Sequence, residues 1–202
     1  MTDPMDLVRI NLKGAEILLL QSTTQGLDIL SQILTGFGAK QFHRCVTAEE
    51  AKGITEKQTL DLLIVEGQLG DRTTDGFDFV RWLRRSPLEP NAWAPILMVS
   101  GHCSVRNVQK ARDCGANFVV AKPVIPTVLW ERLLWIAREN RPFVKAGDIY
   151  VGPERRFKNE GPPNGMAGRR STDLSAEVGE ATLPNMNQED IDSLLQPKRV
   201  NI

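Results

Sequence analysis

The sequence predicts an α/β domain, a doubly wound five-stranded parallel sheet with helices on its faces, followed by a largely disordered C-terminal tail. Over residues 15–143, short apolar runs alternate with helix-like segments, which is the pattern of parallel strands joined by covering helices. After this region the composition changes to Gly, Pro, Asn and Ser with few aromatic residues, which is typical of chains that do not build a core.

Five short runs are the candidate strands, and the more polar run 41–46 suits an edge of the sheet. The predicted strands are 17–20, 41–46, 62–65, 96–99 and 118–121. Helical spacing or capping signals mark helices around 27–34, after the capping box 47–50, over 77–83, over 105–114 and over 128–137. We divide the chain into an N-terminal extension (1–14), a domain (15–143), a flexible arginine-containing linker (144–186) and a short docking helix (187–196).

The composition fits one domain with a substantial remainder, since 41% of the 202 residues are hydrophobic. Lys and Arg total 25 and so do Asp and Glu, so the net charge favours no particular partner. No run approaches the ~20 apolar residues of a membrane span, and the N-terminus lacks an export signal. We therefore expect a cytoplasmic protein without a membrane partner. Its three cysteines, Cys45, Cys103 and Cys114, are expected to be reduced thiols in or near the core.

Four features recur at a particular spacing within residues 15–143: the third strand ending at Glu66, the Asp75-Gly76 turn, the hydroxyl of Ser100 after the fourth strand, and Lys122-Pro123. In residue type and spacing, this set resembles the receiver domain of bacterial response regulators, a flavodoxin-like fold. In that family a lysine and a cis proline follow the fifth strand. The resemblance implies that Glu66, Ser100 and Lys122 lie at one crevice, and that the protein is a signalling module rather than an enzyme.

The crevice departs from the receiver pattern where the chemistry is most demanding. Receivers accept a phosphoryl group from a histidine kinase on an aspartate, and carboxylates hold the divalent ion that this transfer requires. Receivers have a pair of acidic residues after the first strand, and here Gln21 and Ser22 align with that pair. Glu66 replaces the phosphate-accepting aspartate. We expect neither Mg²⁺ nor another metal to bind, and no required cofactor. An ion pair between Glu66 and Lys122 would instead resemble a permanently occupied site.

Other interpretations of these residues stay open. Glu66 can be the product of drift in an inert scaffold, or it can itself accept phosphate, as in a conventional phosphorelay response regulator. Ser100 and Lys122 can be structural residues at the ends of strands. Val119 stands where receivers usually place a switching aromatic residue, so the usual aromatic toggle is not expected.

The linker contains two paired arginines, Arg155-Arg156 and Arg169-Arg170. Guanidinium groups can stack on purines and hold phosphates with their forked N–H groups. The Gly-Pro-Glu-Arg-Arg segment is similar to the arginine-rich extension of chemotaxis-type receivers that bind cyclic di-GMP, which implies this nucleotide as a ligand. A solvated linker with incidental basic residues is the alternative. Nucleic acid is not expected, because an acidic stretch follows the arginines.

The last predicted element is a short helix with Asn187 as its N-cap. Ile191, Leu194 and Leu195 fall on one face, and so short a helix should fold only against a surface. The pattern Gln-x-x-Ile-Asp-x-Leu-Leu from Gln188 is similar to terminal peptides of the flagellar switch protein FliM and the phosphatase CheZ, which bind CheY-type receivers. Docking in trans on such a receiver and docking in cis on this chain's own domain both fit the pattern.

Together these features predict a non-enzymatic, phosphorylation-independent signalling adaptor that acts in chemotaxis, motility or second-messenger signalling. Its expected partners are a chemotaxis or flagellar protein, such as a CheY-type receiver, and a histidine kinase. The alternative is a conventional phosphorelay response regulator.

Overall fold

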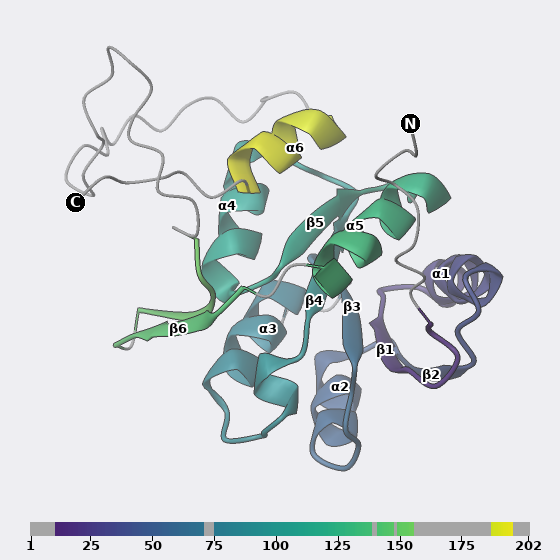
Figure 1. Ribbon diagram of the computed structural model, residues 1–202, viewed down its shortest axis with the longest axis horizontal. Coiled ribbons are helices and arrows are strands. Elements are labelled where there is room, and N and C mark those ends of the chain that lie inside the picture. The colour runs from purple at the N-terminus through teal and green to yellow at the C-terminus, as the bar shows by residue number, and fades with distance from the viewer. Residues whose placement is uncertain (1–10, 71–74, 139–140, 148, 156–186, 196–202) are drawn as a thin grey trace, which may run out of the picture.

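Five parallel strands form the central sheet in the order β2-β1-β3-β4-β5, which confirms the predicted doubly wound fold (Figure 1). The computed structural model describes residues 11–70, 75–138, 141–147, 149–155 and 187–195. The strands are β1 (Glu16–Leu20), β2 (Gln41–Cys45), β3 (Leu62–Glu66), β4 (Ile96–Ser100) and β5 (Phe118–Ala121). As predicted, the polar strand β2 lies at an edge, and β5 forms the other edge.

Helices cover both faces of the sheet because successive strand residues point to opposite sides. Leu18 belongs to the apolar cluster under α2, α3 and α4, whereas Leu19 belongs to the cluster under α1 and α5. The helices are α1 (Thr24–Gly36), α2 (Ala48–Thr55), α3 (Gly76–Arg85), α4 (Val105–Cys114) and α5 (Pro126–Arg138), with a short 3-10 helix at Asn91–Trp93. The three cysteines are buried free thiols, as expected.

Local sequence signals set the helix ends. Thr47 and Glu50 form the predicted capping box of α2. Asp75 caps α3 by accepting a hydrogen bond from the N–H of Asp78 at 2.8 Å. Gly115 ends α4 with a φ of +97°, a left-handed conformation that favours glycine.

The structure differs from the predicted flexible linker at its start, because residues 143–153 form an antiparallel hairpin of β6 (Phe143–Ala146) and β7 (Tyr150–Pro153). The hairpin packs on α3 and α4 (Figure 1). Its backbone comes so close to α4 that a Cβ on Gly115 would lie 2.3 Å from the carbonyl oxygen of Val151. The apolar residues of this segment therefore pack on the domain, although the composition of the segment predicted a flexible linker.

A buried arginine joins this hairpin to the domain. Arg84, at the end of α3, is 2% exposed, and burial lowers its pKa to about 9. The guanidinium donates hydrogen bonds to neutral oxygens, those of Gly115, Ala92, Ala94 and the side chain of Asn117. The ring of Phe143 in β6 lies 4.9 Å from the guanidinium carbon. The hairpin thus covers one side of this buried charge.

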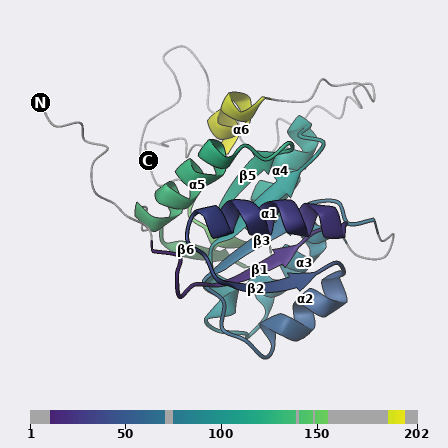
Figure 2. The same ribbon diagram turned by 90° about the vertical axis from the view of Figure 1, so that its right-hand side faces the viewer.

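The last described element, α6 (Gln188–Leu195), falls within the predicted docking helix and lies beside α4, β5 and α5 (Figure 2). Among the described residues, no helix combines the length and the apolar character that crossing a bilayer requires. Most of the predicted N-terminal extension, the linker from residue 156 to 186 and residue 196 lie outside the described residues.

Candidate functional site

The carboxyl ends of β1, β3, β4 and β5 meet at one edge of the sheet, where ligands of open α/β folds bind. These strand ends carry the five residues predicted to form the pocket. They are Gln21, Ser22, Glu66, Ser100 and Lys122. The structure joins three of the five directly and turns the other two toward different partners.

Glu66 has both carboxylate oxygens engaged. Its Oε1 forms an ion pair with the Nζ of Lys122, as the sequence predicted. Its Oε2 accepts hydrogen bonds from the backbone N–H of Ser22 at 2.7 Å and from the Ser22 hydroxyl at 2.8 Å. Glu66 is 8% exposed, so these contacts are shielded from water. The carboxylate is fully used within the protein.

The electrostatics of Glu66 favour its charged form. Burial raises the pKa of this carboxyl, but the hydrogen bonds from Lys122 and Ser22 outweigh burial and hold the pKa below its usual value. The charged Glu66 therefore stabilises the folded state. This contribution is complete above the ordinary glutamate pKa of about 4.3, and it is lost as the pH falls through the lowered pKa of Glu66 in the folded protein.

The donor set does not fit the magnesium ion that receiver chemistry implies. A hard cation needs several free oxygen ligands, usually including carboxylates. Gln21 is fully buried and its amide donates to the carbonyl oxygen of Leu20 at 2.9 Å, while Ser22 is hydrogen-bonded to Glu66. Among the described residues, no group of three or more Asp, Glu, His or Cys side chains could hold a metal ion. Among the five predicted pocket residues, only Glu66 carries a carboxylate, and that carboxylate is held by the ammonium of Lys122.

The hydroxyl of Ser100 contacts the loop that follows β4. Its hydroxyl donates to the carbonyl oxygen of His102 at 3.0 Å and accepts from the His102 N–H at 3.3 Å. The amide of Asn107 donates to the same carbonyl oxygen at 2.8 Å. Ser100 therefore orders the β4–α4 loop, a structural use that the sequence left open.

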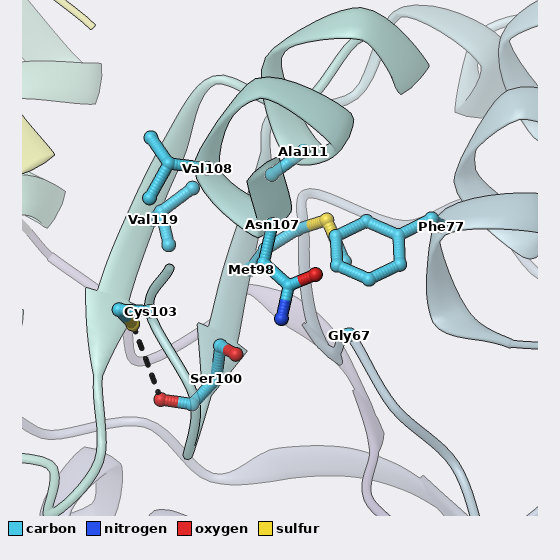
Figure 3. Close-up of a pocket in the computed structure, with 9 residues that line it drawn as sticks. All are labelled: Gly67, Phe77, Met98, Ser100, Cys103, Asn107, Val108, Ala111 and Val119. Atoms are coloured by element: carbon cyan, nitrogen blue, oxygen red, sulfur yellow. Dashed lines mark hydrogen bonds between the residues drawn. The ribbon is translucent and has the colours of Figure 1, made fainter. Parts of the chain in front are cut away.

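Two small residues shape the surroundings of the pocket. A Cβ on Gly76 would lie 1.9 Å from the backbone oxygen of Glu66, so α3 can begin here only with glycine. Val119, at the position of the usual aromatic switch, is buried beside Val108 and Ala111 (Figure 3). Lys122-Pro123 is a cis peptide bond, as the resemblance implied.

Arg155 is the one described member of the predicted cyclic di-GMP set, since Arg156, Arg169 and Arg170 lie outside the described residues. Its guanidinium donates to Asp113 at 2.8 Å and to the backbone oxygen of Arg112 at 2.6 Å. The same group lies 3.8 Å from the ring centroid of Tyr150. A nucleotide that used Arg155 would have to displace these contacts.

The docking helix rests on its own domain. Ile191, a predicted docking residue, is completely buried, whereas the side chains of Leu194 and Leu195 lie outside the description. Sequence reasoning missed three further contact residues, Gln188, Asp192 and Arg132. The first two belong to the quoted motif, so their spacing from Ile191 was the available signal. No local sequence signal pointed to Arg132, because its partner Asp192 lies far along the chain.

The comparisons with known proteins agree with the observed fold. A family model described as the response regulator receiver domain matches residues 17–134. A CheY-like receiver domain protein from Methanospirillum hungatei shares 27% identity with a TM-score of 0.52, over 59% of this chain and 90% of its own. A search of curated proteins found no match.

Two further solved structures show the same fold. Chemotaxis protein CheY4 from Vibrio cholerae is 23% identical with a TM-score of 0.53, over 59% of this chain and 96% of its own. The receiver domain of a sensor histidine kinase from Pseudomonas aeruginosa, whose structure holds a magnesium ion in its active-site cleft, is 22% identical with a TM-score of 0.53, over 61% and 96%. Since the family model covers more than half of the chain, the protein belongs to the response regulator receiver family.

Proposed function

We propose that this protein is a phosphorylation-independent signalling adaptor, a receiver that works through protein contacts without accepting phosphate. The observation that carries the proposal is the closed carboxylate of Glu66, which is bound on one oxygen by Lys122 and on the other by Ser22. A phosphoacceptor needs a carboxylate oxygen free to attack phosphorus and a divalent cation to neutralise the developing charge. The contacts of Glu66 with Lys122 and Ser22 provide neither, and this supports a receiver that does not accept phosphate.

The charge arrangement supports a constant state. In Glu66 the extra methylene, relative to aspartate, extends the carboxylate to the ammonium of Lys122. This places a fixed negative group against the lysine and the Ser22 hydroxyl, in the part of the pocket where a receiver's phosphoryl group would develop charge. The pair thereby takes the place of a transient modification.

The partners that we propose follow from the family. Receivers are signalling modules, and a chemotaxis or flagellar protein in the cytoplasm is the expected contact, with a histidine kinase as a second one. Nucleic acid is not among the proposed partners, because an acidic stretch follows the arginines of the linker.

Intact-mass spectrometry after incubation with acetyl phosphate and magnesium tests the proposal. We expect no added phosphoryl group on the full chain, while a CheY-type receiver treated in parallel gains one, which verifies the reagent. A magnesium-dependent phosphoryl group that is present on the full chain and absent from Glu66→Gln would make the protein a conventional phosphorelay receiver.

A further inference from the structure

α6 binds its own domain through one face. Gln188, Ile191 and Asp192 are spaced i, i+3 and i+4, so their side chains project from the same side of the helix. Ile191 is 0% exposed and belongs to the apolar cluster that contains residues of α4 and β5. Asp192 forms an ion pair with Arg132 of α5, and both side chains are largely buried. We call the receiving surface of α4, β5 and α5 the α6 dock (Figures 1 and 2).

The carboxamide of Gln188 takes the place of a peptide group from a neighbouring strand. Its Oε1 accepts a hydrogen bond from the N–H of Ala121 at 3.1 Å, and its Nε2 donates to the carbonyl oxygen of Val119 at 3.0 Å. β5 is the last strand of the described sheet, and an edge of this kind is a template for pairing with another segment. α6 therefore recognises backbone atoms at the end of β5.

A second contact fixes the direction of this carboxamide. Its Nε2 also donates to Asp192 Oδ1 at 3.1 Å, and the other oxygen of Asp192 pairs with Arg132. Burial raises the pKa of Asp192, although hydrogen bonds from Gln188 and Arg132 act in the opposite sense. Docking thus withdraws this carboxylate from water and gives it two partners in return.

The end of β5 contacts both α6 and the pocket. Ala121 donates its N–H to Gln188, and the next residue, Lys122, forms the ion pair with Glu66. The N–H of Lys122 donates to the backbone oxygen of Ser100 in β4 at 2.8 Å. The ion pair with Glu66 and the contact with α6 are therefore made by adjacent residues of the chain, Lys122 and Ala121.

We propose that the α6 dock is a helix-docking site that is occupied in the free protein by α6 of the same chain, and that the Glu66–Lys122 ion pair keeps β5 in the position that α6 recognises. A helix from a partner binds this face only after it displaces α6. Because α6 is covalently attached, the partner competes with an effective concentration on the order of millimolar.

This inference builds on the proposed function, since it assigns a task to the ion pair that replaces phosphorylation there. The two can fail separately. A protein that accepts no phosphate can still hold α6 independently of Glu66, and mass spectrometry does not report on α6.

Amide hydrogen exchange on the full-length chain, followed by NMR, tests both parts. The N–H of Ala121 donates to a side chain of α6, so its exchange rate reports docking directly. We expect Gln188→Ala to raise this rate at least about tenfold, and Glu66→Gln to raise it by a factor within the roughly 5- to 150-fold range of allosteric coupling. The amides of β1 and β3 should stay protected in both variants.

Glu49→Gln is the matched control, because Glu49 forms an exposed pair with Lys52 on α2, far from β5. It should leave the Ala121 rate unchanged. An unchanged rate in Gln188→Ala would remove α6 as the occupant. A raised rate in Gln188→Ala with an unchanged rate in Glu66→Gln would overturn the coupling to the ion pair.

A binding measurement covers the case in which Glu66→Gln fails to fold. A labelled peptide of residues 187–195 should bind the Gln188→Ala chain at least about tenfold more tightly than the unaltered chain, in which α6 blocks the dock. Adding Lys122→Met to Gln188→Ala should lower the affinity of the chain for the labelled peptide again. Equal binding to the unaltered and Gln188→Ala chains would overturn the occupancy, and equal binding with and without Lys122→Met would overturn the coupling.

Sedimentation of the unaltered chain separates docking in cis from exchange between copies. We expect a monomer at micromolar concentration. A dimer that Gln188→Ala dissociates would place α6 on a second copy and overturn the proposal.

Discussion

The β6–β7 hairpin and α6 both lie beyond the family-matched residues 17–134, yet the domain holds them by different means. The hairpin lays its backbone against Gly115 and covers the buried charge of Arg84, so it shares the core of the domain. The described contacts of α6 centre on Ile191, the Gln188 carboxamide and the Asp192–Arg132 ion pair. The hairpin should therefore unfold only with the domain, whereas α6 can open locally.

The largest effect should come from Gly115→Ala, compared with Gly38→Ala. Both glycines have left-handed backbones, with φ of +97° and +95°, so both variants carry a strain of about 1–2 kcal/mol. At Gly115 the new Cβ would also lie 2.3 Å from the Val151 oxygen, whereas at Gly38 nothing lies within 4 Å. We expect the hairpin contact to cost roughly 1–3 kcal/mol more, measured by urea unfolding. Equal losses in the two variants would show that the hairpin is not part of the cooperative unit.

A smaller difference is expected between Val151→Ala and Ile191→Ala. Each variant truncates a buried aliphatic side chain, Val151 in the hairpin and Ile191 in α6. Val151→Ala should lower the global free energy of unfolding by about 1–2 kcal/mol, as core truncations do. Ile191→Ala removes more volume, but its effect on the global free energy of unfolding cannot exceed the docking free energy of α6, so we expect a loss below the roughly 2–5 kcal/mol that truncating a core isoleucine to alanine costs. Urea unfolding gives the global values, and hydrogen exchange in α6 should rise in Ile191→Ala alone. A loss of about 2–5 kcal/mol in Ile191→Ala would show that α6 belongs to the core of the domain.

The smallest effect concerns cyclic di-GMP, whose binding to the arginines of the tail stays a prediction. Arg155 ends the hairpin and is held by Asp113, an exposed carboxylate. If Arg155 is a ligand, Asp113→Asn should strengthen nucleotide binding by about two- to fivefold, the worth of a surface ion pair. Calorimetry on the full chain measures this, with Asp28→Asn, which disrupts the exposed pair with Arg44, as the control. Absence of heat in all three proteins would remove the nucleotide from the function.

Sequence patterns predicted the framework because it is built from local signals. The short runs gave the five strands, the Thr47 capping box gave the start of α2, and the helix predicted over 105–114 has the bounds of α4. The hairpin was missed, although Gly147-Asp148 between apolar residues is a turn signal, because the change in composition after residue 143 was given more weight.

At the candidate site, the sequence alone determined which chemistry is missing and which ion pair replaces it. Residue types at strand ends fix the available charges, so Gln21, Ser22, Glu66 and Lys122 could be interpreted before any geometry was known. Only the tertiary structure decided that Ser22 closes the second oxygen of Glu66, that Ser100 turns to its own loop, and that Gln188 binds the edge of β5. These are contacts between side chains and particular backbone or hydroxyl groups, and their partners follow from how the strands and helices pack, which no local pattern in the chain specifies.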